Sequence, residues 1–372
     1  MKILTTGGHL TPALAFIDYV LGQSDPEFVF LGRKFSQIEN QQRSHESQAI
    51  AERKIKFVQF QSGKLSYHSP LQLFAQTWQV LLGFVKATQI LKAEKPDVVV
   101  LFGGYLAVPV AIASWLKRIP VITHEQTAVA SLSNQIIGLF SKKIAVSHTT
   151  ALTQFPFKKA VFTGNLLRQK LEEKNPTTPS WYKSTEKHPL LYVTGGNQGS
   201  QVINATITQI LPQLTKDWVV IHQCGAPTKQ TNYRQQLQNE MLRLSQPAQS
   251  RYYVKEWITE EELTWIYKQA SAVISRAGAN TTFELQHFGI PTIFIPLPFS
   301  HKQEQLKNAE LAVKSGGSIV LSQKHLTPET LLAALKTLSL TLGSRRKKML
   351  LHDGNTQGTK KLWKLVKSYA TK

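Results

Sequence analysis

The stretch Leu190-Leu191-Tyr192-Val193-Thr194-Gly195-Gly196-Asn197-Gln198-Gly199 leads from a short apolar strand straight into a glycine-rich turn. Two other stretches have the same form, Ile3-Leu4-Thr5-Thr6-Gly7-Gly8-His9 and Val98-Val99-Val100-Leu101-Phe102-Gly103-Gly104-Tyr105. Such a turn lets the backbone approach a ligand closely and leaves N–H groups at a helix start free to bind an anion. One turn of this kind is common for packing alone. Three of them, with two starting the two halves of the chain, predict two nucleotide-fold domains that face a shared cleft.

The composition is that of a globular protein long enough for two domains. The chain has 372 residues, of which 42% are hydrophobic, and each half can bury its own core. Cys224 is the only cysteine, which rules out an intramolecular disulfide and fits a reducing compartment. We expect neither a signal peptide nor a spanning helix, because polar residues interrupt every apolar run. These features predict a soluble or peripheral protein in the cytoplasm.

The net charge of +21 is unusually high and predicts an anionic partner. Nucleic acid, anionic lipid and a phosphorylated substrate all fit such an excess of basic side chains. The sequence contains no recognised nucleic-acid-binding motif, so nucleic acid is the second choice. An apolar segment considered below favours membrane lipid.

Strand-like runs alternate with helical patterns throughout, which is typical of parallel sheets covered by helices. We expect a first domain over residues 1–163 and a second over residues 164–351, with the polar stretch Glu172–His188 as a surface connection near the boundary. The predicted strands are Lys2–Thr6, Phe28–Leu31, Lys56–Gln59, Asp97–Phe102, Val121–His124, Lys143–Ser147, Ala160–Thr163, Leu190–Thr194, Val219–Gln223, Tyr252–Lys255, Ala272–Ser275, Thr292–Ile295 and Ser318–Leu321.

The segment Ser275-Arg276-Ala277-Gly278-Ala279-Asn280-Thr281-Thr282-Phe283-Glu284 leads from a predicted strand into a predicted helix. Backbone N–H groups around Gly278 can hold a pyrophosphate at the positive end of the helix dipole. Glu284 falls two turns into the helix, where a carboxylate can accept hydrogen bonds from two ribose hydroxyls. Taken alone, the segment is explained equally well by a capped helix with an incidental glutamate.

Other short motifs occur in a fixed order around this segment, namely Gly7-Gly8-His9 with Pro12, His124-Glu125-Gln126, Gly164-Asn165 with Arg168, and residues 195–199. Together they resemble MurG, the family of peptidoglycan glycosyltransferases that transfer N-acetylglucosamine from UDP-GlcNAc to a lipid-linked muramoyl-pentapeptide. The resemblance runs from the first strand to about Ala309 and continues more loosely over the remaining residues. It implies the GT-B fold, an α/β architecture of two Rossmann-like domains with parallel sheets facing a central cleft. It also implies that a C-terminal helix, at about residues 352–372, packs back on the first domain.

The resemblance places the donor site mainly in the second half of the chain, with Glu284 at the ribose and the backbone of Ile258 at the uracil. The residues that it implies for UDP-GlcNAc are Arg168, Asn197, Gln198, Gly199, Ile258, Gly278, Ala279, Glu284, Glu304 and Gln305. Those that it implies for the acceptor are Gly7, Gly8, His9, Gly103, Gly104, Tyr105, Gln126 and Thr127. No metal or other cofactor is expected, because a chain this rich in basic side chains is suited to binding two pyrophosphate groups without a metal ion.

The chain departs from the family's motifs at four places. The glycine run before His9 is shorter, Thr127 replaces an asparagine, Asn197 replaces a serine, and Glu304 aligns with the first glutamine of a Gln-Gln pair. The shorter glycine run and Thr127 concern the predicted acceptor site, whereas Asn197 and Glu304 concern the predicted donor site.

An inverting transfer needs a base near the acceptor hydroxyl and stabilisation of charge on the leaving diphosphate. His9 and Glu125 are the candidate catalytic residues. The imidazole of a histidine, with an ordinary pKa of about 6.5, can act as a base at neutral pH. The alternatives are that His9 only hydrogen-bonds the acceptor and that Glu125 is a buried group at a strand end. The sequence leaves the choice of base open.

Residues 69–86 form a helical pattern that carries almost no charge and is apolar nearly all round. Such a helix is either buried in a core or in contact with lipid. In the family, the corresponding region is the proposed membrane patch, which here implies Leu71, Phe74, Trp78, Leu82 and Lys86. The segment Thr359–Tyr369 predicts an amphipathic basic helix, which either docks on a domain or touches a membrane surface.

The leading hypothesis is a metal-independent, inverting hexosyltransferase that adds GlcNAc to undecaprenyl-diphosphate-MurNAc-pentapeptide, converting lipid I to lipid II in peptidoglycan synthesis. We expect it to be peripheral, on the cytoplasmic face of the plasma membrane, with no nucleic-acid partner. The rivals are another GT-B lipid glycosyltransferase, such as one making glycosyl-diacylglycerol, a hexosamine epimerase, and a non-catalytic nucleotide-sugar-binding membrane protein.

Overall fold

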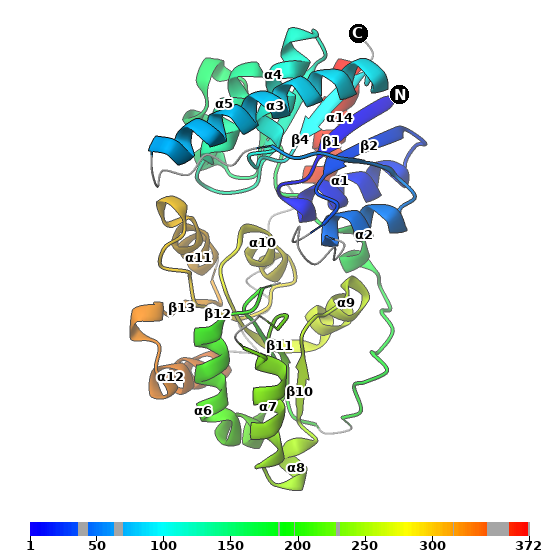
Figure 1. The fold of residues 1–372 in the computed structure, drawn as a ribbon. Coiled ribbons are helices and arrows are strands. Elements are labelled where there is room, and N and C mark those ends of the chain that lie inside the picture. The colour runs from blue at the N-terminus through cyan, green and yellow to red at the C-terminus, as the bar shows by residue number, and fades with distance from the viewer. Residues whose placement is uncertain are drawn as a thin grey trace. The chain divides into compact units, whose positions relative to one another are not determined.

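The computed structural model describes residues 1–35, 44–62, 70–184, 187–196, 198–227, 231–314, 316–340 and 357–370, apart from the side chains of residues 45, 70–80 and 301. The chain divides into two compact units, each with its own parallel sheet (Figure 1). Unit 1 comprises Met1–Gln169 with Asp353–Lys372, and unit 2 comprises Lys170–His352.

Unit 1 is built on a parallel sheet with the strand order β3-β2-β1-β4-β5-β6-β7. Its central strand β1 pairs with β2 on one side and with β4 on the other, so that Thr5 lies opposite Phe30 and Val100. The elements of this unit are β1 (Lys2–Thr6), α1 (Leu10–Leu21), β2 (Glu27–Gly32), α2 (His45–Glu52), β3 (Lys56–Gln59), α3 (Pro70–Glu94), β4 (Val98–Leu101), α4 (Ala107–Leu116), β5 (Val121–Glu125), α5 (Leu132–Phe140), β6 (Lys143–Val146), η1 (Thr149–Gln154), η2 (Pro156–Lys158), β7 (Ala160–Phe162) and α14 (Gly358–Ala370).

The two faces of this sheet are covered by different helices, as alternation along a strand requires. Ile3 packs in a cluster with residues of α1, α2 and α14, whereas its neighbour Leu4 packs with residues of α3, α4 and α5. α14 packs against α1 and buries Leu362, Trp363 and Val366 in the same cluster as Ile3. The core of unit 1 therefore joins segments from both ends of the chain.

Unit 2 repeats the same plan with the strand order β10-β9-β8-β11-β12-β13, all parallel. The short 3₁₀ helix η3 (Gln169–Glu172) begins the connection to it. The other elements are β8 (Leu190–Thr194), α6 (Gln201–Asp217), β9 (Val219–Gln223), α7 (Tyr233–Leu242), α8 (Gln246–Gln249), β10 (Tyr252–Lys255), α9 (Glu260–Gln269), β11 (Ala270–Ser275), α10 (Ala279–His287), β12 (Thr292–Phe294), η4 (His301–Gln303), α11 (Glu304–Lys314), β13 (Ile319–Val320), η5 (Gln323–His325) and α12 (Pro328–Ser339).

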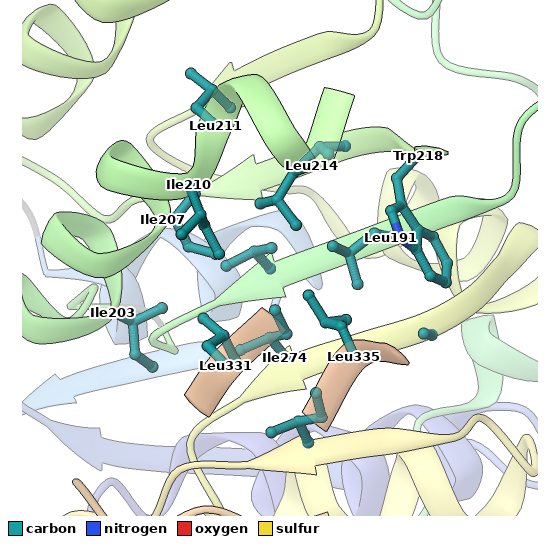
Figure 2. Packing of buried hydrophobic residues seen from close by; sticks show 14 of the residues in the cluster. Leu191, Ile203, Ile207, Ile210, Leu211, Leu214, Trp218, Ile274, Leu331 and Leu335 are labelled. Carbon is teal, nitrogen blue, oxygen red and sulfur yellow. The ribbon is translucent and has the colours of Figure 1, made fainter. Parts of the chain in front are cut away.

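Helix α6 shows how the sequence builds the core of unit 2. The Ser200 hydroxyl caps the helix by accepting a hydrogen bond from the N–H of Ile203. Buried apolar residues then recur at helical spacing and meet β8, β11 and α12 (Figure 2). Shortening one of them, such as Ile207, to Ala is expected to cost about 2–5 kcal/mol of stability.

The structure confirms all thirteen predicted strands, with end residues that differ by at most two positions. It also confirms the predicted fold class of two parallel-sheet α/β domains. Within the described ranges, none of the helices has the length and apolar character needed to cross a membrane.

Candidate functional site

Each sheet changes the direction of its strand order between two central strands, and the glycine turns lie there. In unit 1 the change falls between β1 and β4, whose carboxyl ends run into Gly7-Gly8-His9 and Gly103-Gly104-Tyr105. In unit 2 it falls between β8 and β11, which run into Gly195-Gly196 and Arg276–Gly278. Ligands of open α/β sheets bind at the carboxyl ends of the strands at such switch points.

The two glycine turns of unit 1 pack backbone against backbone. Gly8 has a φ of +141° and Gly104 a φ of +83°, values that residues with a side chain rarely adopt. A Cβ on Gly8 would lie 2.5 Å from the Gly103 carbonyl oxygen, and one on Gly104 would lie 2.9 Å from the Gly8 Cα. Glycine is therefore needed at both positions for the turns to meet.

His9 lies at this junction, as the residue that precedes α1. Its Nδ1 atom is buried, has no hydrogen-bond partner among the described residues, and lies 3.5 Å from where a Cβ of Gly103 would be. The N–H of Gly7 donates to the Leu31 carbonyl at 2.7 Å, and the N–H of Gly104 donates to the Ser133 hydroxyl at 3.1 Å. These two N–H groups are thus engaged within the protein, whereas His9 Nδ1 is among the buried polar atoms near the turns that have no partner in the described part of the chain, together with the hydroxyls of Thr5 and Thr6.

Glu125, the last residue of β5, is fully buried and accepts hydrogen bonds on both carboxylate oxygens. Thr127 donates to Oε1 from its N–H at 3.0 Å and its hydroxyl at 2.7 Å. Ser131 donates to Oε2 from its N–H and its hydroxyl, both at 2.9 Å, and Asn134 Nδ2 donates at 3.0 Å. Burial by itself would raise the pKa of Glu125, but these hydrogen bonds outweigh it and hold the pKa below its usual value. Glu125 is thus an ionised centre that organises the loop after β5.

The neighbours of Glu125 in its motif are buried as well. His124 contacts the Ser147 hydroxyl through Nε2 at 3.1 Å, and burial lowers its pKa to about 4, so it is neutral at pH 7. Gln126 and Thr127 are also buried. Thr127, which stands where the family has an asparagine, uses its hydroxyl on Glu125. Within this motif, the Glu125 carboxylate therefore holds Thr127, whereas His124 contacts Ser147.

The glycine loop of unit 2 packs against the turn after β9. Gly199 has a φ of +73°, and a Cβ there would lie 2.1 Å from the Cys224 carbonyl oxygen. Asn204 of α6 binds that same carbonyl through Nδ2 at 2.9 Å and contacts His222 Nε2 through Oδ1 at 3.0 Å. Gln198 is exposed, and Asn197 lies outside the described residues. Buried hydrogen bonds through Asn204 thus hold the turn against which the end of this loop packs.

Helix α10 begins at the carboxyl end of β11 with Gly278 as its N-cap, and this residue makes no side-chain cap. A Cβ on Gly278 would meet nothing within 4 Å, so the backbone there borders open space. Two turns further on, Glu284 is only 2% exposed, and the Tyr267 hydroxyl donates to its Oε2 at 3.3 Å. The helix therefore combines an open, positively polarised start with a carboxylate on the same element.

The remaining residues predicted for the donor are spread over several elements. Gln305, near the start of α11, accepts a hydrogen bond from the Leu297 N–H at 3.0 Å, and Glu304 begins that helix. Ile258 is buried just before α9. Arg168 belongs to unit 1, whereas the other described donor residues belong to unit 2.

Sequence reasoning gave no role to Arg276, which follows the last residue of β11. Its Nη1 donates to the carbonyl oxygens of Ile295 at 3.0 Å and Pro296 at 3.4 Å, and its Nη2 donates to the Ser200 hydroxyl at 2.7 Å. A lone cation directly after a buried strand was the available signal. Ser131 and Asn134 were missed too, because their importance comes only from their contacts with Glu125.

Comparison with known proteins agrees with this architecture. The family model for the glycosyltransferase family 28 N-terminal domain matches residues 4–146, and the one for the C-terminal domain matches residues 190–364. The UDP-N-acetylglucosamine–N-acetylmuramyl-(pentapeptide) pyrophosphoryl-undecaprenol N-acetylglucosamine transferase of Clostridium kluyveri is 32% identical over 374 residues, which cover 99% of each chain.

Solved structures give the same result. The crystal structure of MurG from Acinetobacter baumannii aligns with a TM-score of 0.68 and 25% identity over 99% of each chain. A putative UDP-N-acetylglucosamine 2-epimerase from Listeria monocytogenes aligns with a TM-score of 0.66 over 99% of this chain and 96% of its own, but its 12% identity shows a common fold alone. The two domain matches and the full-length identity together mean that this chain belongs to glycosyltransferase family 28 and, within it, to the MurG family of GT-B enzymes.

Proposed function

We propose that this protein is an inverting transferase that moves N-acetylglucosamine from UDP-GlcNAc to undecaprenyl-diphosphate-linked N-acetylmuramoyl-pentapeptide. The observation that carries the proposal is the construction of α10, where the open start at Gly278 precedes the buried carboxylate of Glu284. A diphosphate suits the first feature, and the paired hydroxyls of a ribose suit the second. The full-length similarity to a transferase of this reaction supports the choice of donor and acceptor.

The donor half of the site belongs to the proposal as well. We assign the diphosphate to the start of α10 at Gly278 and Ala279 and to the loop ending at Gly199, and the ribose to Glu284. Gln305, whose Oε1 is already bonded to the Leu297 N–H, keeps its amide N–H groups for sugar hydroxyls. Arg168, Ile258, Gln198 and Glu304 complete the assignment made from the sequence.

His9 is the better candidate for the base. In the reaction the acceptor hydroxyl oxygen attacks the anomeric carbon, its proton passes to the base, and the bond to the diphosphate breaks to release UDP. The base must be able to take a proton at neutral pH. Glu125 is buried under five hydrogen bonds that favour its ionised form, whereas His9 Nδ1 has no partner among the described residues. We therefore assign proton transfer to His9 and loop organisation to Glu125.

A surface of unit 1 supports peripheral binding to a membrane. Trp115 is 54% exposed at the end of α4, and Phe157 is 74% exposed in η2. Leu116 and Leu139 are exposed too, and Trp115 packs edge-to-face against Phe140, which joins the ends of α4 and α5. The cations beside these side chains in the sequence are Lys117, Arg118, Lys142, Lys158 and Lys159. Exposed aromatic side chains mixed with cations fit an anionic lipid surface.

The structure describes only part of the patch that the sequence predicts on α3. Leu82 and Lys86 are exposed on this helix, whereas the side chains of Leu71, Phe74 and Trp78 lie outside the described residues. We propose that the exposed side of α3 and the Trp115–Phe157 surface face the lipid, on the cytoplasmic side of the plasma membrane.

One assay separates this function from its rivals. Release of UDP is measured with a panel of nucleotide sugars, in the presence of lipid I, of diacylglycerol or of neither, with and without EDTA. The proposal expects release only with UDP-GlcNAc and lipid I, unaffected by EDTA. Release with diacylglycerol would indicate a glycolipid synthase, conversion of UDP-GlcNAc without any acceptor an epimerase, and binding without turnover a nucleotide-sugar-binding protein.

A further inference from the structure

Trp181 lies in the connection that begins with η3 and leads to β8, and its side chain packs on unit 2. The indole N–H donates a hydrogen bond to Oε1 of Glu262, in the first turn of α9. The Nζ atom of Lys255, the last residue of β10, lies over the indole ring at 4.4 Å from its centroid. A single side chain therefore contacts both ends of the loop between β10 and α9.

The carboxylate that Trp181 contacts also fixes the start of α9. Its Oε2 accepts a hydrogen bond from the N–H of Thr259, the N-cap, at 2.8 Å, and the N–H of Glu262 donates to the Thr259 hydroxyl at 3.3 Å. Such a reciprocal capping box determines how the chain enters a helix. Through Glu262, Trp181 therefore holds the residue that directly follows Ile258.

Other contacts attach the same connection to α9 without involving the loop. The Thr264 hydroxyl donates to the Lys170 carbonyl at 3.1 Å. The ring of Tyr182 packs against Trp265, with the ring centroids 4.6 Å apart. We therefore expect the connection to stay attached when Trp181 is replaced, so that the contact of Trp181 with the loop can be tested separately.

We propose that Trp181 is a positioning residue for nucleobase recognition, which fixes the loop of residues 256–259 so that the backbone of Ile258 meets uracil in one arrangement. The inference rests on the donor site proposed above, where Ile258 receives the base. Uracil and cytosine exchange a hydrogen-bond donor and an acceptor at N3 and at the group on C4, so a backbone held in one arrangement distinguishes them. A loop that is released at one end adjusts to either base, and selectivity falls before binding is lost.

The test compares the affinities of the full-length protein for UDP and CDP, which differ in the base alone. Both are measured by calorimetry, with the weaker nucleotide determined by displacement. Trp181→Phe keeps an aromatic ring beside Lys255 but removes the N–H that binds Glu262. This variant is expected to lower the UDP-to-CDP affinity ratio by at least about fivefold, mainly through weaker binding of UDP.

Tyr182→Phe is the matched control. It also removes one hydrogen bond of an aromatic side chain in the connection, but the partner is Ser184, within the connection itself. Its UDP-to-CDP ratio should stay within about twofold of wild type. An unchanged ratio in Trp181→Phe, even with equal losses for both nucleotides, or an equal fall in Tyr182→Phe, would show that Trp181 is only structural and would overturn the inference.

If Trp181→Phe does not fold, Glu262→Gln decides. Glutamine also serves at this position of a capping box, but it leaves the N–H of Trp181 or that of Thr259 without an acceptor. The same fall in the ratio supports the inference, and an unchanged ratio refutes it. A wild-type protein that binds CDP as tightly as UDP would contradict the placement of uracil at Ile258 as well, which distinguishes failure of the donor site from failure of this inference.

Discussion

Ser131 donates two hydrogen bonds to a single carboxylate oxygen of Glu125, one from its backbone N–H and one from its hydroxyl, both at 2.9 Å. Ser131 is also the N-cap of α5, so the carboxylate fixes the start of that helix as well as the loop after β5. The charge of Glu125 is thus used to shape the proposed acceptor side of unit 1, where the glycine turns and His9 meet.

Replacing His9 or Glu125 is expected to give two different defects. His9→Ala should lower kcat by at least about a hundredfold, as expected for loss of a general base, with the affinity for UDP unchanged. Steady-state kinetics with lipid I and calorimetry with UDP provide the two measurements.

Glu125→Gln is the contrasting variant. A glutamine turns an NH₂ group toward donors that need an acceptor, and each donor left unpaired costs about 1–3 kcal/mol. The expected result is a lower melting temperature. A fully stable Glu125→Gln protein with a larger loss of kcat than His9→Ala would instead make Glu125 the base.

Two glycine substitutions should separate folding from binding. Gly104→Ala is expected to destabilise the protein, because its φ is +83° and its Cβ would press on the Gly8 backbone at 2.9 Å. Gly278→Ala should cost much less stability, since its Cβ would meet nothing within 4 Å and alanine is only a poorer N-cap than glycine, but it should weaken UDP by occupying the space at the start of α10. Thermal unfolding and UDP titration of both variants check this pair. A Gly278→Ala protein destabilised as much as Gly104→Ala, or a stable Gly104→Ala, would contradict it.

Glu284→Ala is expected to weaken UDP by about 1.5–3 kcal/mol, the usual range for hydrogen bonds to a charged group. Glu310→Ala, which removes an exposed carboxylate from the neighbouring helix α11, is the control and should bind UDP like wild type. Calorimetric titration decides between them. Unchanged UDP affinity in Glu284→Ala would remove the ribose assignment.

The surface around Trp115 predicts the behaviour on vesicles. Trp115→Ser combined with Phe157→Asn should reduce binding to anionic vesicles by at least about tenfold, because two exposed aromatic side chains are lost. Asparagine suits position 157, where φ is +59°. Leu242→Ser, at an exposed position of unit 2, is the control. Sedimentation with vesicles tests this, and equal binding by the double variant and the control would place the lipid-binding surface elsewhere.

Two buried histidines predict how stability depends on pH. Burial lowers the pKa of His222 to about 3 and that of His124 to about 4, whereas an unfolded histidine has a pKa of about 6.5. Below about pH 6.5 the unfolded chain therefore binds protons that the folded chain excludes, and stability falls as the pH falls, by about 1.4 kcal/mol per pH unit for each group. His222→Asn should remove one such contribution. Denaturant unfolding of the wild type and of His222→Asn between pH 7 and pH 4.5 measures how steeply the free energy of unfolding changes with pH. Equal slopes in the two proteins would mean that His222 plays no part.

The sequence alone was sufficient for the strands and the fold class, since apolar runs ending in glycine are local patterns. The order of the strands in the sheets could not be predicted from the sequence, because no local pattern indicates that β1 pairs with β4 as well as with β2. The motifs located the candidate site, because Gly8 and Gly104 have conformations that glycine alone adopts easily.

The sequence could not predict which partners individual side chains would contact. The sequence offered both His9 and Glu125 as candidates for the base, and it could not reveal the contacts of Glu125 with Thr127, Ser131 and Asn134 that support the proposal of His9. Arg276 received no role because its partners, Ser200 and Ile295, come from other strands' loops. Such contacts depend on how distant segments meet.

The return of α14 to unit 1 has a consequence for biosynthesis. The apolar cluster that contains Phe16 and Ile3 also contains Leu362, Trp363 and Val366, so it stays incomplete until α14 has emerged from the ribosome. Unit 2, by contrast, is one continuous stretch from Lys170 to His352. During translation unit 2 can therefore finish folding before unit 1, although most of unit 1 is synthesised earlier.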